Sequence, residues 1–181
     1  MLARGRISAV NEPAEAVGVA VGMRCAEAAE LLRAAPWRLG EPPAVGEGRA
    51  VERPAGAVRD LVLIDSASLV DAAADRGAVI VTGSHGGLVG GDPAMALRAE
   101  GFAAAYNDAG VGIDDAGIGR LPALQARGIA GITVSAGSAR IGEARETLRG
   151  VITAANARAV ELGARVGEAA EPVLLAWTRM A

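Results

Sequence analysis

The sequence predicts an α/β protein with a three-layer open sheet that is mainly parallel, preceded by an N-terminal arm or small cap. From residue 61 onward, short apolar runs of strand length alternate with alanine-rich helical stretches, which is typical of consecutive βαβ units. Before residue 59 this alternation is missing, and prolines stand among glycines and charged residues. We therefore expect an arm or cap segment over residues 1–58 and an α/β core domain over residues 59–181.

The N-terminal segment contains one helical run and a proline-rich stretch. Residues 23–35 have the composition of a helix, and the prolines that follow are Pro36, Pro42, Pro43 and Pro54. Proline cannot continue a helix, so the helix should end near residue 35. Residues 17–21 are rich in valine and form a weaker candidate for a fifth strand.

Four apolar runs in the core are expected to be strands: residues 61–64, 78–81, 102–106 and 132–134. Each run is apolar throughout, as expected for strands that helices cover on both faces. Helices are expected between them at residues 68–75, 93–99 and 118–126. Each is followed by a glycine suited to a helix C-terminus, namely Gly77, Gly101 and Gly128.

Beyond the fourth strand, the sequence predicts one long helix over residues 138–162. Its apolar residues recur at three- and four-residue spacing: Ile141, Ala144, Leu148, Ile152, Ala155, Ala159 and Leu162. A last element over residues 172–180 suits either a short helix or an edge strand.

Charge and composition exclude several classes of function. The net charge is −3 and basic residues are dispersed, so binding to nucleic acid or to an anionic membrane is not expected. All 18 basic residues are arginine, which excludes a Schiff-base lysine and a lysine-dependent phosphate loop. No G-x-G-x-x-G fingerprint and no G-x-S-x-G nucleophile elbow occurs.

The single cysteine and the absence of a long apolar run predict a cytoplasmic protein. Cys25 cannot form an internal disulfide, which is compatible with a reducing compartment. It suits a small buried apolar residue better than the nucleophile of a Cys–His pair. No run of eighteen apolar residues is present, and Asn11, Glu12 and Pro13 interrupt the N-terminal region before a signal-like segment develops.

Polar residues follow each of the four expected core strands, where parallel sheets bind their ligands. The loop at residues 82–91 has five glycines in ten residues and carries the only histidine, His85. Glycine lets a backbone approach a ligand closely, so His85 is the leading candidate for a general acid or base. The alternative role of His85 is a hydrogen bond within its own loop.

Two carboxylates, Asp65 and Asp108, directly follow apolar strands, where they need a partner to offset desolvation. Either can orient His85, and together with His85 they can supply ligands to Mg²⁺, Mn²⁺ or Zn²⁺, although no metal is required. The alternative is capping of the following helix. Asp114 and Asp115, in a second glycine-rich loop, suit a solvated turn.

A second anion-binding element is expected after the fourth strand, where Ser135, Ser138 and Arg140 surround a predicted helix N-terminus. Ordinary serine capping with a solvated Arg140 is the alternative. The expected site therefore comprises the catalytic residues His85, Asp108 and Asp65 and the substrate-binding residues Thr82, Ser84, Gly86, Gly87, Asn107, Ser135, Ser138 and Arg140.

These residues favour an enzyme acting on a small anionic metabolite, a hydrolase, lyase or isomerase, with the amides of residues 84–87 stabilising developing negative charge. The alternative is a non-catalytic ligand-binding or regulatory subunit that uses the same loops. The mean hydropathy of +0.31 is high for a soluble chain of this length. Apolar surface is therefore expected to be buried between subunits of a homo-oligomer, through the long helix or the arm.

Overall fold

A computed structural model describes residues 3–36, 40–41 and 46–181. The chain divides into two compact units, Met1–Val45 and Gly46–Ala181. The division falls before strand β1 (Arg49–Glu52), because β1 pairs with the second strand of the sheet. Residues 46–58, expected in the arm, thus belong to the α/β unit. Pro42 and Pro43 lie outside the described residues.

The described residues of the N-terminal unit form two helices, α1 (Glu12–Ala16) and α2 (Cys25–Ala34). The Asn11 side chain caps α1 by accepting a hydrogen bond from the Ala14 amide. Helix α2 confirms the helix expected over residues 23–35. The strand expected over residues 17–21 is wrong, because Val17 ends α1 and Gly18 turns the chain with a φ of 91°.

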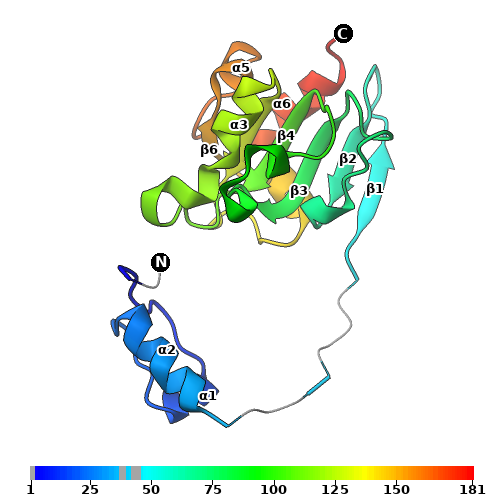
Figure 1. The fold of residues 1–181 in the computed structure, drawn as a ribbon. Helices are drawn as coiled ribbons and strands as arrows, with labels where there is room; N and C mark the ends of the chain where they lie inside the picture. Colours follow the sequence, from blue (N-terminus) through cyan, green and yellow to red (C-terminus); the bar gives the residue numbers. More distant parts are fainter. Residues whose placement is uncertain (1–2, 37–39, 42–45) are drawn as a thin grey trace. The chain divides into compact units, whose positions relative to one another are not determined.

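The second unit is built on a mixed six-stranded sheet whose strands lie in chain order (Figure 1). The central strands, β2 to β5, run parallel, whereas β1 and β6 pair antiparallel at the two edges. Strands β2 to β5 confirm the four strands expected from the sequence. Their bounds are Leu61–Ile64, Val79–His85, Ala103–Asn107 and Ala130–Val134, and β6 spans Ile152–Ala155.

The long helix expected over residues 138–162 is wrong. The segment contains a short helix, α4 (Ala144–Arg149), then β6, then a second short helix, α5 (Ala157–Glu161). Gly150 ends α4, and a Cβ there would lie 2.8 Å from Val134, so the chain passes too close to β5 to remain helical. Residues 152–155 then pair with β5 instead of continuing a helix.

The connections between the parallel strands contain less helix than expected. The expected helix at 68–75 is only a 3₁₀ turn, η1 (Ala67–Leu69), and that at 93–99 is a 3₁₀ turn, η3 (Pro93–Ala96). Two further 3₁₀ segments, η2 (Val89–Gly91) and η4 (Ile113–Ile118), precede β4 and α3. Helix α3 (Arg120–Ala126) agrees with the helix expected over residues 118–126. The last element, expected over residues 172–180 as a helix or an edge strand, is helix α6 (Ala170–Thr178).

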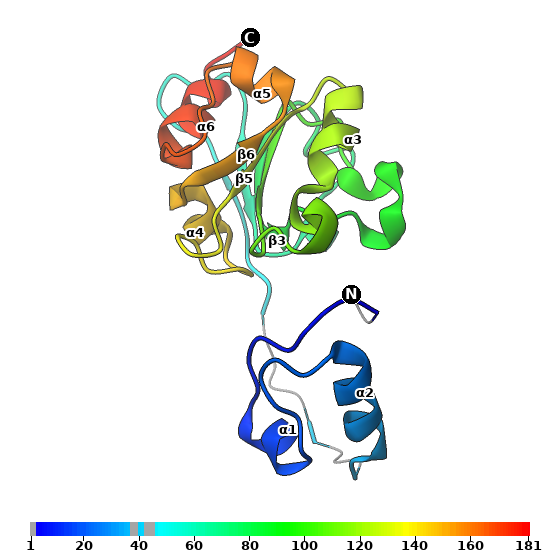
Figure 2. The same cartoon turned by 90° about the vertical axis from the view of Figure 1, so that its left-hand side faces the viewer.

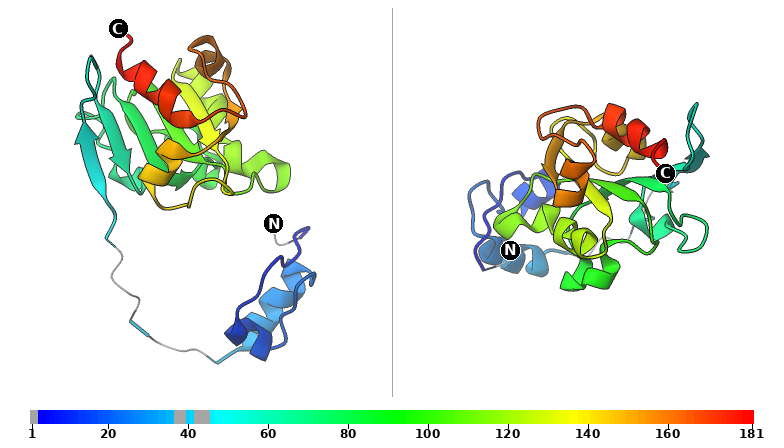
Figure 3. Two further views of the ribbon diagram at one scale, coloured as in Figure 1. Left: turned by 180° about the vertical axis from the view of Figure 1, so that it is seen from behind. Right: turned by 90° about the horizontal axis from the view of Figure 1, so that it is seen from above.

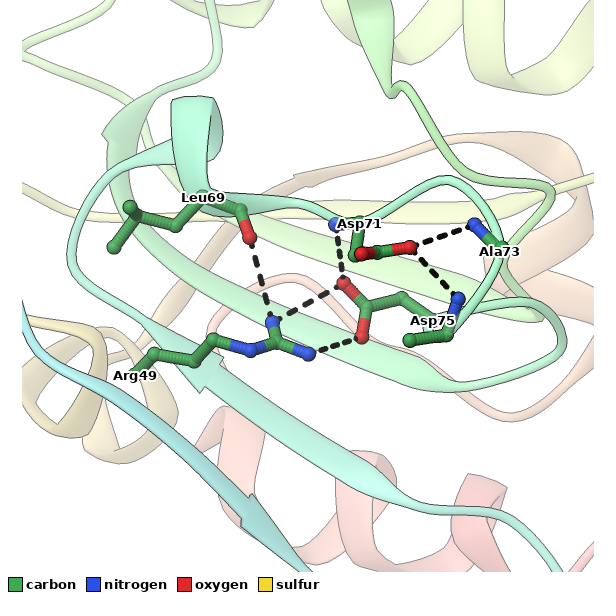
Figure 4. A network of polar contacts seen from close by, with 6 residues as sticks. Arg49, Leu69, Asp71, Ala73 and Asp75 are labelled. Carbon is green, nitrogen blue, oxygen red and sulfur yellow. Dashed lines mark hydrogen bonds and ion pairs between the residues drawn. The ribbon is translucent and has the colours of Figure 1, made fainter.

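Aspartate side chains explain why the helix at 68–75 does not form. The Asp71 carboxylate accepts hydrogen bonds from the amides of Ala73 and Ala74, and the Asp75 carboxylate accepts one from the Asp71 amide (Figure 4). Such local bonds offer the backbone an alternative to helical pairing. The segment therefore folds as a series of turns.

Apolar side chains pack on both faces of the sheet. Leu63 and Val81 belong to the cluster that includes Leu148 of α4 and Trp177 of α6. Val62, Ile64 and Ile80, with the opposite alternation, belong to the cluster that includes Leu124 of α3. Figure 2 shows α4 and α6 on one side of the sheet and α3 on the other, and Figure 3 shows α6 from behind.

Candidate functional site

A cavity of about 240 Å³ lies beside the carboxyl ends of β2 and β3. Strand β3 continues past the last residue that it pairs with β2, so Ser84 and His85 project beyond the edge of that ladder. The turn η1, segments η2 and η3, and the first residue of α3 supply the other walls. The lining residues are Ser66, Ala67, Ser68, Ser84, His85, Val89, Met95, Leu97, Arg98 and Arg120.

Three serine hydroxyls line this His85 cavity. The Ser84 Oγ accepts a hydrogen bond of 2.9 Å from the Ala67 amide, which leaves its own hydrogen free to donate. The hydroxyls of Ser66 and Ser68 lie 2.8 Å apart and share one hydrogen bond. Because one hydrogen serves that bond, the pair retains a second hydrogen for another acceptor.

His85 is an exposed side chain whose orientation is set by its own loop. Its Nδ1 accepts a hydrogen bond of 3.1 Å from the Gly87 amide. An imidazole nitrogen that accepts carries no proton, so neutral His85 has its proton on Nε2. His85 therefore offers an N–H donor, and the orienting role expected for a carboxylate is performed by a backbone amide.

Arg120 is the least expected member of the cavity, because it is only 5% exposed. Its Nε donates to the Gly87 carbonyl, and its Nη1 donates to the carbonyls of Met95 and Ala96. Its guanidinium also lies over the Tyr106 ring, 4.9 Å from the centroid, a favourable cation–π contact. These bonds hold the walls of the cavity together.

The positive charge of Arg120 has no carboxylate partner within the described residues. Its hydrogen bonds go to backbone carbonyls, and it takes part in none of the ion pairs found there. Buried charges are costly unless paired. A second guanidinium, that of exposed Arg98, lines the same cavity and donates to the Ser68 carbonyl. None of the described residues that line it is acidic, so the cavity suits an anion.

The two carboxylates expected to assist His85 are engaged elsewhere. The Asp65 oxygens accept hydrogen bonds from the amides of Gly48 and Ala144, so Asp65 ties the chain before β1 to the start of α4. The buried Asp108 Oδ1 accepts from the amides of Gly110 and Ala136. Neither residue lines the His85 cavity.

Two further expected residues, Thr82 and Asn107, are buried and bonded to the backbone. The Thr82 hydroxyl donates to the Ala105 carbonyl, and the Asn107 side chain donates to the Ala139 carbonyl. Among the amides expected to stabilise negative charge, that of Gly86 donates to the Asn107 carbonyl and that of Gly87 to His85. These groups build the loop beneath the cavity.

The element expected to bind an anion after the fourth strand lies outside the cavity. The Ser135 Oγ accepts from the Gly137 amide, and the Ser138 hydroxyl donates to the Ser135 carbonyl. Arg140 is 79% exposed and pairs with Glu143. Cys25 is a partly buried free thiol in the separate N-terminal unit. Of the expected residues, only Ser84 and His85 line the His85 cavity.

The glycines next to His85 permit a close approach between two loops. A Cβ on Gly86 would lie 2.5 Å from the Gly117 carbonyl, and one on Gly87 would lie 2.6 Å from the Ala116 carbonyl. The facing loop is itself strained, since Val111 has a φ of 62°, a conformation unfavourable for a β-branched residue. The His85 loop therefore packs closely against the segment that leads into Arg120.

The polar cavity residues that were not among the expected site residues are Ser66, Ser68, Arg98 and Arg120. The two serines belong to the polar stretch directly after the first core strand, so their position was a usable signal. Arg98 and Arg120 follow η3 and η4 in the chain, far from any strand end. Only the tertiary structure brings their side chains to His85.

The fold and the cavity define an α/β unit with a positively charged, carboxylate-free pocket at the carboxyl edge of its parallel strands. Comparisons of the chain with protein-family models, curated proteins and solved structures found no match.

Neither a metal-ligating cluster nor a membrane-length helix occurs in the described part of the chain. No group of three or more His, Cys, Asp or Glu side chains there could hold a metal ion, and Asp65, His85 and Asp108 form no such group. None of the helices in these residues has the length and apolar character needed to cross a bilayer.

Proposed function

We propose that this protein is an enzyme acting on a small anionic metabolite, and that the His85 cavity is its active site, in a three-layer α/β domain preceded by an N-terminal arm. One observation carries the proposal. The buried Arg120 guanidinium lacks a carboxylate partner and lines the same cavity as the only histidine. An anionic substrate would supply the missing charge.

The lining residues divide into binding and reacting groups. Arg120 and Arg98 bind the anion, and the Ser84 hydroxyl donates a hydrogen bond to it. His85 is the acid/base group, working through Nε2. Because Nδ1 accepts the hydrogen bond from the Gly87 amide, His85 can donate a hydrogen bond through Nε2–H. That hydrogen bond would stabilise negative charge that develops on the substrate. Hydrolysis, elimination and isomerisation all place such charge on an oxygen.

A second candidate is a non-catalytic ligand-binding or regulatory subunit. It is favoured by the bonds of Asp65 and Asp108 to backbone amides, which leave His85 without the carboxylate that commonly orients a catalytic imidazole. In this role the same cavity holds an effector without transforming it.

Anion binding is tested by thermal unfolding of the full chain with phosphate, sulfate, acetate and citrate at equal ionic strength. At least one anion should raise the unfolding midpoint, because a ligand that binds the folded state stabilises it. Arg98→Ala should reduce the rise. Arg158→Gln, which alters a partly exposed arginine paired with Glu161, should not. Equal shifts in both variants, or none with any anion, contradict the proposed site.

Catalysis is tested by proton NMR of the protein mixed with short aliphatic phosphates and carboxylates. The enzyme proposal expects conversion of at least one compound by the natural sequence and a loss of about 10²-fold or more with His85→Gln, in line with general acid–base contributions. Binding without conversion across the mixture contradicts the enzyme and supports the second candidate.

The proposal extends to cofactors, partners and location. No metal or organic cofactor is required, so treatment with EDTA should leave activity and thermal stability unchanged. The partners are the small anion and further copies of the chain, with neither nucleic acid nor a membrane bound. The dispersed charge and single cysteine favour this set and a cytoplasmic location.

A further inference from the structure

The polar groups around the His85 cavity also indicate which kind of anion it holds. We infer that the cavity binds a tetrahedral, doubly charged oxyanion, and that the ligand is a phosphate monoester or phosphonate with a short aliphatic body. The inference rests on the proposed function, since it names the chemical class of the anion expected there.

The charge of the cavity favours a doubly charged group. Two guanidiniums, those of Arg98 and Arg120, line it, and none of its lining residues is acidic. A carboxylate brings one negative charge and would leave one guanidinium uncompensated. A phosphate monoester carries roughly −1.5 to −2 at neutral pH and balances both.

The number of available donors favours a tetrahedral group. The Ser84 hydroxyl and one hydroxyl of the pair Ser66 and Ser68 each keep a hydrogen to donate. The Nε2–H of His85 adds a third donor, because only Nδ1 is held by the loop.

The two arginines contribute further donors. Arg98 donates to the protein through Nη1, and Arg120 through Nε and Nη1. Neither side chain uses its Nη2 for these bonds to backbone carbonyls, and the Arg120 guanidinium also contacts the Tyr106 side chain. These five donors belong to side chains that line different walls of the cavity, whereas a planar carboxylate has two oxygens with about four acceptor sites in one plane. A phosphate presents three strong acceptor oxygens spread in three dimensions.

The apolar wall of the cavity indicates which kind of group is attached to the phosphate or phosphonate. Val89, Met95 and Leu97 are apolar, and none of the lining residues is a phenylalanine, tyrosine or tryptophan. Its volume of about 240 Å³ lies below the roughly 300–1,000 Å³ typical of pockets for drug-sized molecules. A short aliphatic chain fits this wall, whereas a nucleobase would find no phenyl, phenol or indole ring on which to stack.

The experiment is isothermal titration calorimetry of the full chain with four probes: n-propyl phosphate, inorganic phosphate, acetate and adenosine monophosphate. We expect propyl phosphate to bind at least as tightly as inorganic phosphate, and acetate to bind at least about tenfold more weakly, the loss of one charge-assisted hydrogen bond. Adenosine monophosphate should bind no more tightly than propyl phosphate.

Two variants assign the binding to this cavity without altering buried Arg120. Ser84→Ala and Arg98→Ala should each weaken propyl phosphate binding by about tenfold. Arg158→Gln, in α5, should leave it unchanged. Circular dichroism of each variant checks its fold, and Arg98, as an exposed side chain, keeps the test valid if Ser84→Ala perturbs the loop.

The outcomes separate this inference from the proposed function. Acetate binding as tightly as phosphate, with both variants weakening it, overturns the tetrahedral anion but leaves an anion site in the cavity. Tighter binding of adenosine monophosphate than of propyl phosphate overturns the aliphatic body. Phosphate binding that neither variant weakens, or no binding of any probe, overturns the inference together with the proposed cavity.

Discussion

Tyr106 is the only tyrosine of the chain and is fully buried beneath Arg120. Its hydroxyl donates a hydrogen bond of 2.8 Å to the Ala96 carbonyl, which also accepts from Arg120. Burial raises the pKa of Tyr106 from 10.0 to about 12, despite the opposing effect of the nearby Arg120 charge. The folded protein thus holds a phenol proton that the unfolded chain releases near pH 10.

This shift predicts how stability changes at alkaline pH. Between pH 10 and about 12 the unfolded chain loses the Tyr106 proton while the folded chain keeps it, so the free energy of unfolding should fall as pH rises. The expected slope approaches about 1.4 kcal/mol per pH unit. Urea unfolding from pH 9 to 12 measures it.

Tyr106→Phe is the control for this prediction. The variant should be less stable at pH 9, because it lacks the hydrogen bond to Ala96, by about 1 kcal/mol. It should show no comparable fall between pH 10 and 12. The chain contains no lysine, whose ordinary pKa lies in the same range. An equal slope in both proteins would show that Tyr106 is not the group responsible.

Gly87 makes a second prediction at the residue scale. A Cβ there would lie 2.6 Å from the Ala116 carbonyl and 3.0 Å from His85 Nδ1. Gly87→Ala should therefore destabilise the protein by about 1–3 kcal/mol, the usual cost of overpacking, and weaken anion binding by displacing His85. Gly46→Ala, where a Cβ meets nothing within 4 Å, is the matched control for urea unfolding. Similar stability in both variants would contradict the close packing.

At the scale of elements, one ion pair joins edge strand β1 to the turns before β3. Arg49 donates to both oxygens of Asp75, whose side chain is 1% exposed, and the Arg49 Nη1 also lies 3.5 Å from the Leu69 carbonyl (Figure 4). The hydrogen bond with Asp75 raises the pKa of Arg49. The pair thereby holds residues 66–75, which begin with the cavity serines, against β1.

Removing Arg49 tests this role. Arg49→Met would leave the Asp75 carboxylate buried without its cation, and we expect the free energy of unfolding to fall by about 2–3 kcal/mol, less than for a fully buried pair because Arg49 is partly exposed. Arg53→Met breaks the exposed pair with Asp60 and should cost at most about 1 kcal/mol. Equal losses in urea unfolding would remove any special role for the buried pair.

At the scale of the whole molecule, the division of the chain at residue 45 predicts the outcome of two truncations. Residues 46–181 should unfold cooperatively with the stability of the same unit in the full chain. Residues 58–181 lack β1, so β2 loses its antiparallel partner and Asp75 loses Arg49. Lower stability and aggregation through the open sheet edge are expected for this piece. Thermal unfolding and light scattering compare the two truncated proteins. Equal stability and equal aggregation would contradict the assignment of β1 to the α/β unit.

Self-association is the second prediction at this scale. Among the described residues of the N-terminal unit few apolar side chains are buried, and Val21 is 63%, Leu31 37% and Leu32 48% exposed. Since the expected long helix does not exist, this unit is the better candidate for contact between copies. Light scattering of the full chain should show a dimer that becomes a monomer in residues 46–181. A monomer in both would exclude the oligomer.

The sequence by itself determined the central strands and the edge of the sheet at which the His85 cavity lies. Strands β2 to β5 were predictable because runs such as 61–64 are apolar throughout and are followed by polar residues or glycine, a local signal that needs no partner. For the same reason Ser84 and His85 were placed correctly at the end of β3. The helix expected over residues 118–126 followed from an equally local signal, a helical stretch that ends at Gly128.

Only the tertiary structure decided the sheet edges and the composition of the cavity. Residues 152–155 fit a helical spacing, yet pairing with β5 makes them a strand, because tertiary contacts outweigh a weak local preference. Asp65 and Asp108 are strand-end carboxylates like those of many active sites, but amides from distant segments bind them. Arg120 joins His85 through the packing of α3 against Tyr106 and η3, and such long-range contacts leave no pattern in the chain.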